Sequence, residues 1–280
     1  MPELPEVETI RAGLNSRVIP ALVESVDVVD PRGLRPSGGL EDAAAFEMTL
    51  TSRRFTAVNR RGKYLWIVLD NGTAMVAHLG MSGQFRIVDR HIPRHRHTRI
   101  VIALDNGQDL RFLDQRTFGG LALVSLIDDI PAPVAHIAPD PFEECFNVDE
   151  VAQRLRSRRS TLKRSLLDQT LVSGIGNIYA DETLWRARRH PDTPCFRLSQ
   201  SEAVELLQTA RQVMAEAICQ GGTSFDSLYV NVNGESGYFD RNLDAYGREG
   251  KPCKRCGELM VREQFTNRSS TRCPRCQRLR

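Results

Sequence analysis

The sequence contains no long hydrophobic segment. None of its apolar runs approaches the about 18 residues that a membrane-spanning helix requires, and no signal-peptide core follows Met1. We therefore expect a cytoplasmic protein that is not held in a membrane. Its hydrophobic content of 41% and charged content of 26% are those of ordinary globular domains. A length of 280 residues predicts two domains and a small appendage.

Net charge is also small, but it is distributed unevenly along the chain. The formal charge is +3, from 38 basic and 35 acidic residues. Between Arg248 and Arg280 there are 10 basic and 3 acidic residues, so this tail carries +7 and the remainder carries −4. A basic tail suits the phosphate backbone of a nucleic acid, although most basic runs are simply solvated surface.

The cysteines do not predict disulfides, because a cytoplasmic protein keeps its thiols reduced. Four of the 7 have the spacing C-x2-C-x16-C-x2-C of a zinc site: Cys253, Cys256, Cys273 and Cys276. We predict one structural zinc ion (Zn²⁺) per chain, because a segment of ~30 residues has too little core to fold unaided. The others are expected to be buried thiols: Cys145, Cys195 and Cys219.

Hydrophobic periodicity predicts a helix followed by a β-rich domain. Residues Pro5–Ser16 have an apolar stripe and a proline near the helix start. From Val18 to Leu126 the pattern favours strands, with two hairpins whose turns are Asp70-Asn71-Gly72 and Asp105-Asn106-Gly107. Several strands in one region indicate a β-sandwich or barrel.

The second half of the chain has a helical pattern. Helices are predicted at 162–171, 178–188 and 199–220, the last with a Ser199-x-x-Glu202 capping box. Prolines between 131 and 141 indicate a domain boundary. The predicted organisation is an N-terminal domain at 1–132, a linker at 133–147, a helical domain at 148–247 with a lid loop at about 221–240, and the zinc finger at 248–280.

The N-terminus carries the first candidate for catalysis. If Met1 is removed, Pro2 presents a secondary amine, which can attack an aldehyde-like carbon and form an iminium. Glu3 places a carboxylate next to it in the chain. Many unrelated proteins also begin Met-Pro, so this pair alone is a weak signal.

Further motifs follow in order along the whole chain. They are Met1–Glu8, Arg61–Leu65, His78–Gly83, Asp114–Gly119, Gly174–Ala180, Gly221–Ser224 and the terminal zinc finger. In this order they resemble the formamidopyrimidine-DNA glycosylase family. The resemblance implies an α+β fold: an N-terminal helix plus β-sandwich domain, then a helical helix–two-turn–helix domain with a zinc-finger β-hairpin.

The resemblance implies a chemical role for four residues. Pro2 would be the nucleophile that attacks C1′ of a damaged nucleotide, and Glu3 its acid/base partner. Lys63 would bind phosphate and assist β-elimination, and Arg268 would clamp phosphate and assist δ-elimination. Without the resemblance, both basic residues would be assigned to the solvated surface.

The resemblance also implies a wedge that fills the gap left by a flipped nucleotide. Its members are Met81, Arg116 and Phe118, and Arg116 would also contact the base left without a partner. Hydrophobicity alone would place Met81 and Phe118 in the core.

The resemblance further implies DNA contacts by His95 (with His97 as the alternative), Arg158 and Asn177. Asn177 is expected to be the N-cap of a helix whose amides bind an anion. A basic cluster precedes it, which is otherwise a solvated face: Arg154, Arg156, Arg158, Arg159, Lys163 and Arg164.

Together these expectations describe a bifunctional DNA glycosylase/AP lyase. Its substrates would be 8-oxoguanine opposite C and formamidopyrimidines in double-stranded DNA, cleaved by β,δ-elimination without a redox cofactor. One alternative is an endonuclease VIII-like enzyme for oxidised pyrimidines, although such relatives begin Pro-Glu-Gly-Pro and Leu4 stands here. Another is a non-catalytic zinc-ribbon DNA-binding module, which needs no free N-terminal proline. We expect a monomer that is nucleoid-associated when on DNA.

Overall fold

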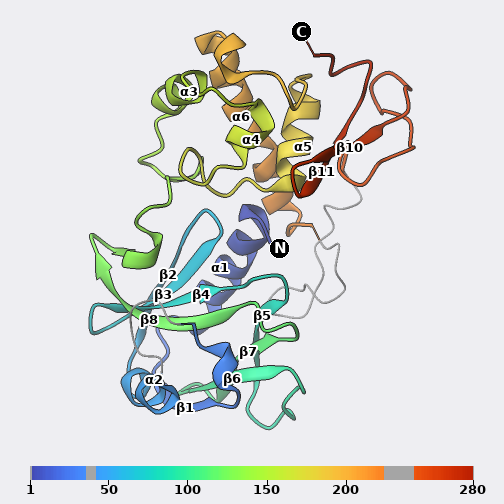
Figure 1. Ribbon diagram of the computed structural model, residues 1–280. Coiled ribbons are helices and arrows are strands. Elements are labelled where there is room, and N and C mark those ends of the chain that lie inside the picture. Colours follow the sequence, from blue (N-terminus) through green and yellow to red (C-terminus); the bar gives the residue numbers. More distant parts are fainter. Residues whose placement is uncertain (1, 36–41, 224–242, 280) are drawn as a thin grey trace. The chain divides into compact units, whose positions relative to one another are not determined.

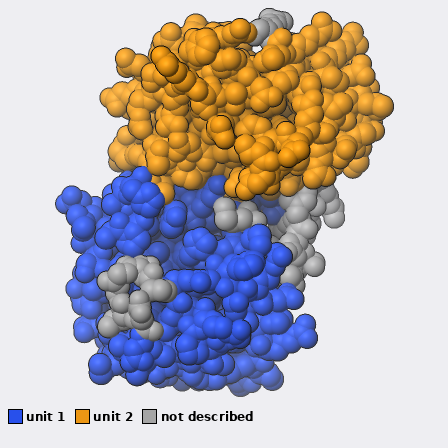
Figure 2. Space-filling view, in the orientation of Figure 1, with its two compact units in different colours: residues 1–2, 6–136, 223–237 blue, residues 3–5, 137–222, 238–280 orange. Residues whose placement is uncertain are grey.

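The computed structural model describes residues 2–35, 42–223 and 243–279. These residues divide into two compact units, coloured separately in Figure 2. The first unit contains Pro2, residues 6–136 and Thr223, and the second contains Glu3–Pro5, residues 137–222 and residues 243–279. No helix among the described residues is long and apolar enough to cross a membrane.

The first unit is built from two antiparallel sheets and two helices (Figure 1). One sheet has the strand order β2-β3-β4-β8-β9, and the other has the order β1-β6-β7-β5. The helices are α1 (Leu4–Val18), which belongs to this unit from Glu6 onward, and α2 (Ala43–Leu50). The strands are β1 (Val23–Val28), β2 (Phe55–Arg61), β3 (Tyr64–Leu69), β4 (Thr73–His78), β5 (Gly83–Asp89), β6 (Thr98–Leu104), β7 (Gln108–Asp114), β8 (Gly120–Ile127) and β9 (Ile130–Pro131).

A single hydrophobic core joins the two sheets to α1. Val7 and Leu14 of the helix are fully buried against residues such as Phe55 of one sheet and Phe112 of the other. The residues of β5 and β7 alternate, so that Phe85, Ile87, Leu110 and Phe112 face this core and their neighbours face outward. The predicted N-terminal helix and β-sandwich are confirmed.

Both predicted hairpins form around the same local turn. Asn71 Oδ1 accepts hydrogen bonds from the backbone N–H and hydroxyl of Thr73, and Asn106 Oδ1 accepts from the N–H of Gln108. Gly72 and Gly107 follow these asparagines with φ of +79° and +83°, a conformation that glycine adopts without strain. Local sequence therefore determines both turns.

The second unit is helical and ends in a β-hairpin. Its helices are α3 (Val148–Arg156), α4 (Leu162–Leu166), α5 (Asn177–Arg186) and α6 (Gln200–Cys219), and the hairpin consists of β10 (Val261–Phe265) and β11 (Arg268–Arg272). Short 3-10 turns lie at Pro31–Gly33, Ala132–Val134 and Cys195–Arg197. The capping box of α6 is present, with the Ser199 hydroxyl and the Glu202 carboxylate each accepting the other's backbone N–H.

The connection between α4 and α5 is organised by one side chain. The Gln169 amide donates to the carbonyls of Leu167 and Ile175 and accepts from the Gly174 N–H. These bonds satisfy backbone groups that two consecutive turns would leave unpaired. The predicted helix–two-turn–helix arrangement is confirmed.

Four expectations about local structure were wrong. Helix α2 was missed inside the β region, although Asp42 caps it and Phe46 and Leu50 share its buried face. The helix predicted at 162–171 ends at Leu166, because Asp168 forms a competing turn with Thr170.

The N-cap of α5 is Gly176 and not Asn177, which is the first helical residue. Among the three scattered cysteines only Cys195 is buried, whereas Cys145 and Cys219 are exposed. The predicted lid loop at 221–240 lies mostly outside the described residues.

Candidate functional site

The Glu3 carboxylate is bound by the backbone at the start of α5. Its oxygens accept hydrogen bonds from the N–H groups of Gly176 at 2.7 Å, Ile178 at 2.9 Å and Tyr179 at 3.2 Å. Glu3 is only 4% exposed. The positive end of the helix and three N–H donors together stabilise a negative charge at this position. The anion expected at this helix start is therefore a side chain of the protein itself.

Two glycines make this close approach geometrically feasible. A Cβ atom on Gly176 would lie 2.3 Å from Cδ of Glu3, and one on Gly174 would lie 2.4 Å from a methyl group of Leu4. Gly174 also has a φ of +93°. Leu4 donates its N–H to the Gly174 carbonyl at 3.1 Å, which pins the chain directly after Glu3. The Gly-Ile-Gly sequence is thus a cradle for residues 3 and 4.

Two other proposed catalytic residues lie in the first unit. Pro2 is buried. Lys63 is half-buried and follows Gly62, whose φ of +56° turns the chain from β2 into β3. The structure therefore places Lys63 at a tight connection between two strands. This connection fixes the point at which the Lys63 side chain leaves the backbone.

The predicted wedge residues Met81, Arg116 and Phe118 lie on two neighbouring loops of the first unit. Met81 is 38% exposed and Phe118 is 50% exposed, so the assignment to the core that hydrophobicity suggested is wrong. The Arg116 guanidinium lies 5.6 Å from the centre of the Phe118 ring and 4.0 Å from the Met81 sulfur. The structure brings all three side chains together.

A buried carboxylate that the sequence did not single out ties these two loops together. Asp114, 1% exposed, accepts hydrogen bonds from the Ser82 hydroxyl, from the Arg116 N–H at 3.1 Å and from the Gly119 N–H at 2.6 Å. The Ser82 oxygen also accepts from the Arg116 N–H at 3.0 Å. Asp114 therefore fixes the backbone on both sides of the wedge.

Arg35 holds the second loop from its other side. Its guanidinium donates to the carbonyl of Gly119 at 2.9 Å and to that of Thr117 at 2.6 Å. Thr117 has a φ of +54°, which is unfavourable for a β-branched residue. The bonds from Arg35 help to hold this strained residue, which lies between Arg116 and Phe118.

Arg268 is exposed at the start of β11, immediately after the two-residue turn of the terminal hairpin. The next residue is anchored: the Ser269 carbonyl accepts hydrogen bonds from Lys163 Nζ at 2.9 Å and from the Asn177 amide at 3.0 Å. Lys163 is fully buried and also bonds Asp181 at 2.6 Å. This buried ion pair between α4 and α5 fixes the hairpin strand that carries Arg268.

The predicted basic cluster is therefore not one solvated face. Lys163 is internal, Arg158 pairs with Asp168, and Arg156 donates to the Leu198 carbonyl at 2.8 Å. Arg158 remains partly exposed, with 28% of its side chain accessible. Asn177 uses its amide on the hairpin, as described above. The sequence did not predict the bond of Arg158 with Asp168 or the bond of Asn177 with the hairpin.

The two histidines before β6 differ in what they leave accessible. His95 is exposed, and its Nδ1 accepts the backbone N–H of His97 at 3.2 Å. His97 is half-buried, and its Nε2 accepts from Arg96 at 3.1 Å. Each ring therefore has one nitrogen engaged, and because His95 is the more exposed of the two it is better placed than His97 to bind a ligand.

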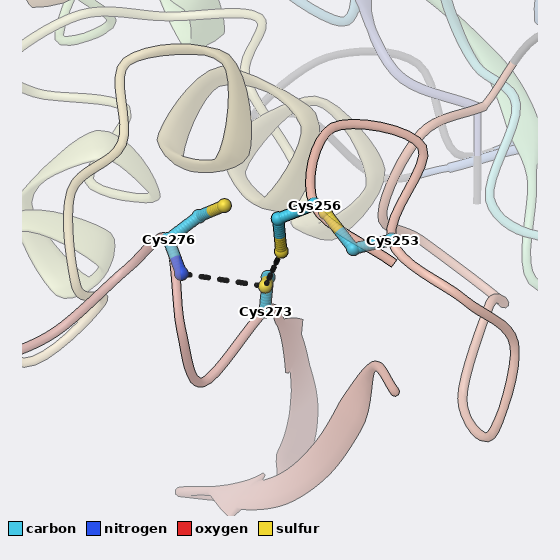
Figure 3. A group of neighbouring side chains, drawn as sticks. All are labelled: Cys253, Cys256, Cys273 and Cys276. Atoms are coloured by element: carbon cyan, nitrogen blue, oxygen red, sulfur yellow. Dashed lines mark hydrogen bonds between the residues drawn. The ribbon is translucent and has the colours of Figure 1, made fainter. Parts of the chain in front are cut away.

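The four tail cysteines form a closed ligand set (Figure 3). Their sulfur atoms all lie within 4.8 Å of one another, and a tetrahedral zinc site with Zn–S bonds of about 2.3 Å requires sulfurs about 3.8 Å apart. The Trp185 ring N–H donates to Cys253 at 3.4 Å. Burial opposes ionisation, but this donor and nearby backbone N–H groups lower the pKa of Cys253 to about 6. The cluster holds one structural zinc ion, because four thiolates leave no position open for a substrate.

Comparison with known proteins places the whole chain in one family. Residues 1–121 match the formamidopyrimidine-DNA glycosylase N-terminal domain, residues 137–228 match the formamidopyrimidine-DNA glycosylase H2TH domain, and residues 250–279 match the zinc finger found in FPG and IleRS. A formamidopyrimidine-DNA glycosylase of Nocardioides sp. is 55% identical over 99% of this chain and 94% of its own length. The chain belongs to the formamidopyrimidine-DNA glycosylase family.

Solved structures agree with this assignment over the full length. A Lactococcus lactis FPG variant, in complex with a Fapy-dG-containing DNA, superposes with a TM-score of 0.87 and 30% identity, covering 99% of this chain and 100% of that one. A MutM structure in complex with carbocyclic 8-oxo-G DNA gives a TM-score of 0.85 at 30% identity, with coverage of 99% and 100%. As a member of the formamidopyrimidine-DNA glycosylase family, the chain is an enzyme, a DNA glycosylase.

Proposed function

We propose that this enzyme removes oxidised purines, including 8-oxoguanine opposite C and formamidopyrimidines, from double-stranded DNA and then cleaves the strand. The observation that carries this proposal is the Glu3 carboxylate. It is held by three backbone N–H groups of the second unit, one residue after Pro2 in the chain. The DNA lesions bound by the related structures are the matching substrates.

In the proposed reaction the Pro2 nitrogen attacks C1′ of the damaged nucleotide. The bond from C1′ to the base breaks, the base leaves, and the sugar ring opens to give an iminium at C1′. The iminium then serves as the electron sink for loss of the 3′ phosphate by β-elimination and of the 5′ phosphate by δ-elimination. These steps need no redox partner, since no electrons are gained or lost overall.

Three residues assist the nucleophile Pro2 with proton and phosphate chemistry in this proposal. Glu3 is supported as a carboxylate by its amide donors, which suits it to accept a proton from the Pro2 amine and later to return one to the sugar. Lys63 binds phosphate beside the sugar and assists β-elimination. Arg268, on the anchored hairpin, clamps phosphate and assists δ-elimination.

DNA binding in this proposal uses both the wedge and backbone contacts. Met81 and Phe118 are exposed apolar side chains that support unstacked bases, and Arg116 bonds the base left without a partner. Arg158 and Asn177 are proposed phosphate contacts, and His95 is a further proposed DNA contact. Arg158 would exchange its bond with Asp168 for one with phosphate, a trade between two charge-assisted interactions.

Borohydride trapping tests the proposal. Untagged protein is incubated with a duplex carrying one 8-oxoguanine opposite C, and the reductant is added to capture an iminium. We expect a covalent protein–DNA band in the wild type and none in Pro2→Gly or in protein with an N-terminal extension. A Thr9→Ala variant, changed in the same helix, serves as the control.

The outcomes also separate the alternatives. A band formed with an oxidised pyrimidine but not with 8-oxoguanine would favour the endonuclease VIII-like specificity. Tight binding with no band on any lesion would leave the non-catalytic DNA-binding module.

We further propose a cytoplasmic, nucleoid-associated monomer. The segment boundaries at 132, 147 and 247 stay predictions.

A further inference from the structure

A pocket of about 520 Å³ lies in the first unit, on the face of the β1-β6-β7-β5 sheet that points away from the core. Residues Gln84, Arg86 and Val88 of β5 and Leu113 of β7 line it, in alternation with the core residues Phe85, Ile87 and Phe112. None of the proposed catalytic residues, Pro2, Glu3, Lys63 or Arg268, is among its lining residues.

The outer face of a two-layer sandwich is normally solvated, but here part of it is covered by the segment between β5 and β6. Arg111 is 4% exposed because it reaches across to the segment between β5 and β6, donating to the Ile92 carbonyl at 2.7 Å and the Pro93 carbonyl at 3.1 Å. Its charge is balanced by Asp109 at 2.9 Å. These bonds hold the 90–97 segment over the sheet, so the pocket has a fixed wall.

Two polar atoms in the lining are buried without a partner. They are the Thr98 hydroxyl oxygen and the Arg86 Nε, and Thr98 as a whole is only 4% exposed. Leaving such a group unpaired in the protein interior is unfavourable. A ligand that bonds these atoms would recover that cost, whereas an ordinary structural surface would have no reason to retain them.

The charge in the pocket is also unbalanced. Arg86 is directly opposite Arg111 in the β5–β7 pairing, and like charges in that position repel. Arg111 has Asp109, and Arg94 at the rim pairs with Asp27 at 2.6 Å, but Arg86 has no hydrogen bond or ion pair with any described residue. Among the described residues that line the pocket there is no Asp or Glu. Burial accordingly lowers the pKa of Arg86.

We propose that this pocket binds a nucleoside monophosphate unit, with its phosphate on Arg86 and its base between the aliphatic side chains. A guanidinium matches phosphate geometry, and the volume lies within the range of about 300–1,000 Å³ that is typical of small-ligand sites. Val88, Ile92, Pro93 and Leu113 supply apolar walls for a flat ring, while Gln84 and Gln115 supply amides for its polar edge. The unit is either a free nucleotide or one nucleotide of a DNA strand.

Calorimetric titration of the zinc-loaded, full-length protein tests the site with three probes: dGMP, deoxyguanosine and inorganic phosphate. We expect dGMP to bind more tightly than either half alone. Arg86→Gln should weaken dGMP binding at least about 10-fold, because a charge-assisted pair is lost. Arg17→Gln removes the same charge from an exposed position outside the pocket and should leave dGMP binding unchanged.

Thr98→Val provides a second variant that does not depend on a charge. It removes the unpaired hydroxyl while keeping the shape, so the melting temperature of the free protein should stay the same or rise. At the same time dGMP binding should weaken about 3- to 10-fold. A fall in both quantities would show that the hydroxyl serves the fold instead, and would overturn its role in the site.

Competition with an undamaged duplex identifies the source of the nucleotide. If the site takes part of a DNA strand, dGMP displaces the duplex and Arg86→Gln weakens duplex binding. If it takes a free nucleotide, dGMP and duplex bind together and Arg86→Gln leaves duplex affinity unchanged. No dGMP binding at millimolar concentration, equal binding by Arg86→Gln, or equal binding of dGMP and phosphate would overturn the proposal. Trapping of the wild-type protein at Pro2, measured without dGMP, does not depend on these outcomes, so the two proposals can fail separately.

Discussion

Replacing Asp114 by asparagine is the most direct test of how the wedge is held. The two side chains have the same shape, but the amide offers one acceptor oxygen where the carboxylate offers two. Asp114 binds Ser82 and Arg116 through one oxygen and Gly119 through the other. The less costly orientation of the introduced amide keeps its oxygen on the Gly119 N–H and points its NH2 group at the Ser82 hydroxyl. The Arg116 N–H then loses this acceptor.

The expected cost follows from these contacts. Charge-assisted hydrogen bonds contribute about 1.5–3 kcal/mol each, and a buried donor left unpaired costs about 1–3 kcal/mol. The Arg116 N–H still donates to the Ser82 oxygen at 3.0 Å. We therefore expect Asp114→Asn to destabilise the ordered wedge loops by about 2 kcal/mol. Because about 1.4 kcal/mol corresponds to a tenfold change, ordered loops should be about 10- to 100-fold less available to the DNA.

Single-turnover cleavage of two substrates measures this effect. On a duplex with 8-oxoguanine opposite C, Asp114→Asn should be about 10- to 100-fold slower than wild type, in line with about 2 kcal/mol. On single-stranded abasic DNA, which has no gap to fill, the rate should stay within about threefold. Asp70→Asn, in an exposed turn of the same unit, is the control. Equal losses on both substrates, or no loss on the duplex, would refute the assignment of Asp114 to the wedge.

Three further predictions concern other parts of the chain. Gly176→Ala should slow iminium trapping at least about 10-fold while the protein stays folded, because its Cβ would meet Glu3 at 2.3 Å; unchanged trapping would show that the Glu3 cradle is dispensable. Chelation of zinc, or Cys253→Ser, should abolish DNA binding in a gel-shift assay, and normal binding by metal-free protein would contradict a structural role. Hydrogen bonding from the Arg32 side chain lowers the pKa of Asp30 from 3.8 to about 2. The unfolded chain binds the proton more tightly, so this contribution to stability is present above about pH 4 and is lost as the pH falls toward 2. The difference in urea midpoint between wild type and Asp30→Asn should therefore shrink over that range, and a constant difference would argue against it.

Local sequence determined the parts of this protein that depend on neighbours in the chain. Both hairpins follow from Asn-Gly turns, the start of α6 follows from the Ser199–Glu202 capping box, and the zinc finger follows from the cysteine spacing. In each case the bonded groups are only a few residues apart in the sequence, or they must bind the same ion. The sequence pattern therefore predicts the local structure without knowledge of the fold. The order of motifs was enough to predict the family and, through it, the residues proposed for catalysis.

Tertiary structure decided where distant charges and apolar groups are placed. Lys163 looked like a member of a solvated basic cluster, yet it is fully buried on Asp181. Met81 and Phe118 looked like core residues, yet they are exposed because Asp114 and Arg35 hold their loops outward. Glu3 found its three amide donors more than 170 residues away along the chain. Side-chain burial depends on which elements pack together, and no local pattern specifies a carboxylate's partner across such a separation.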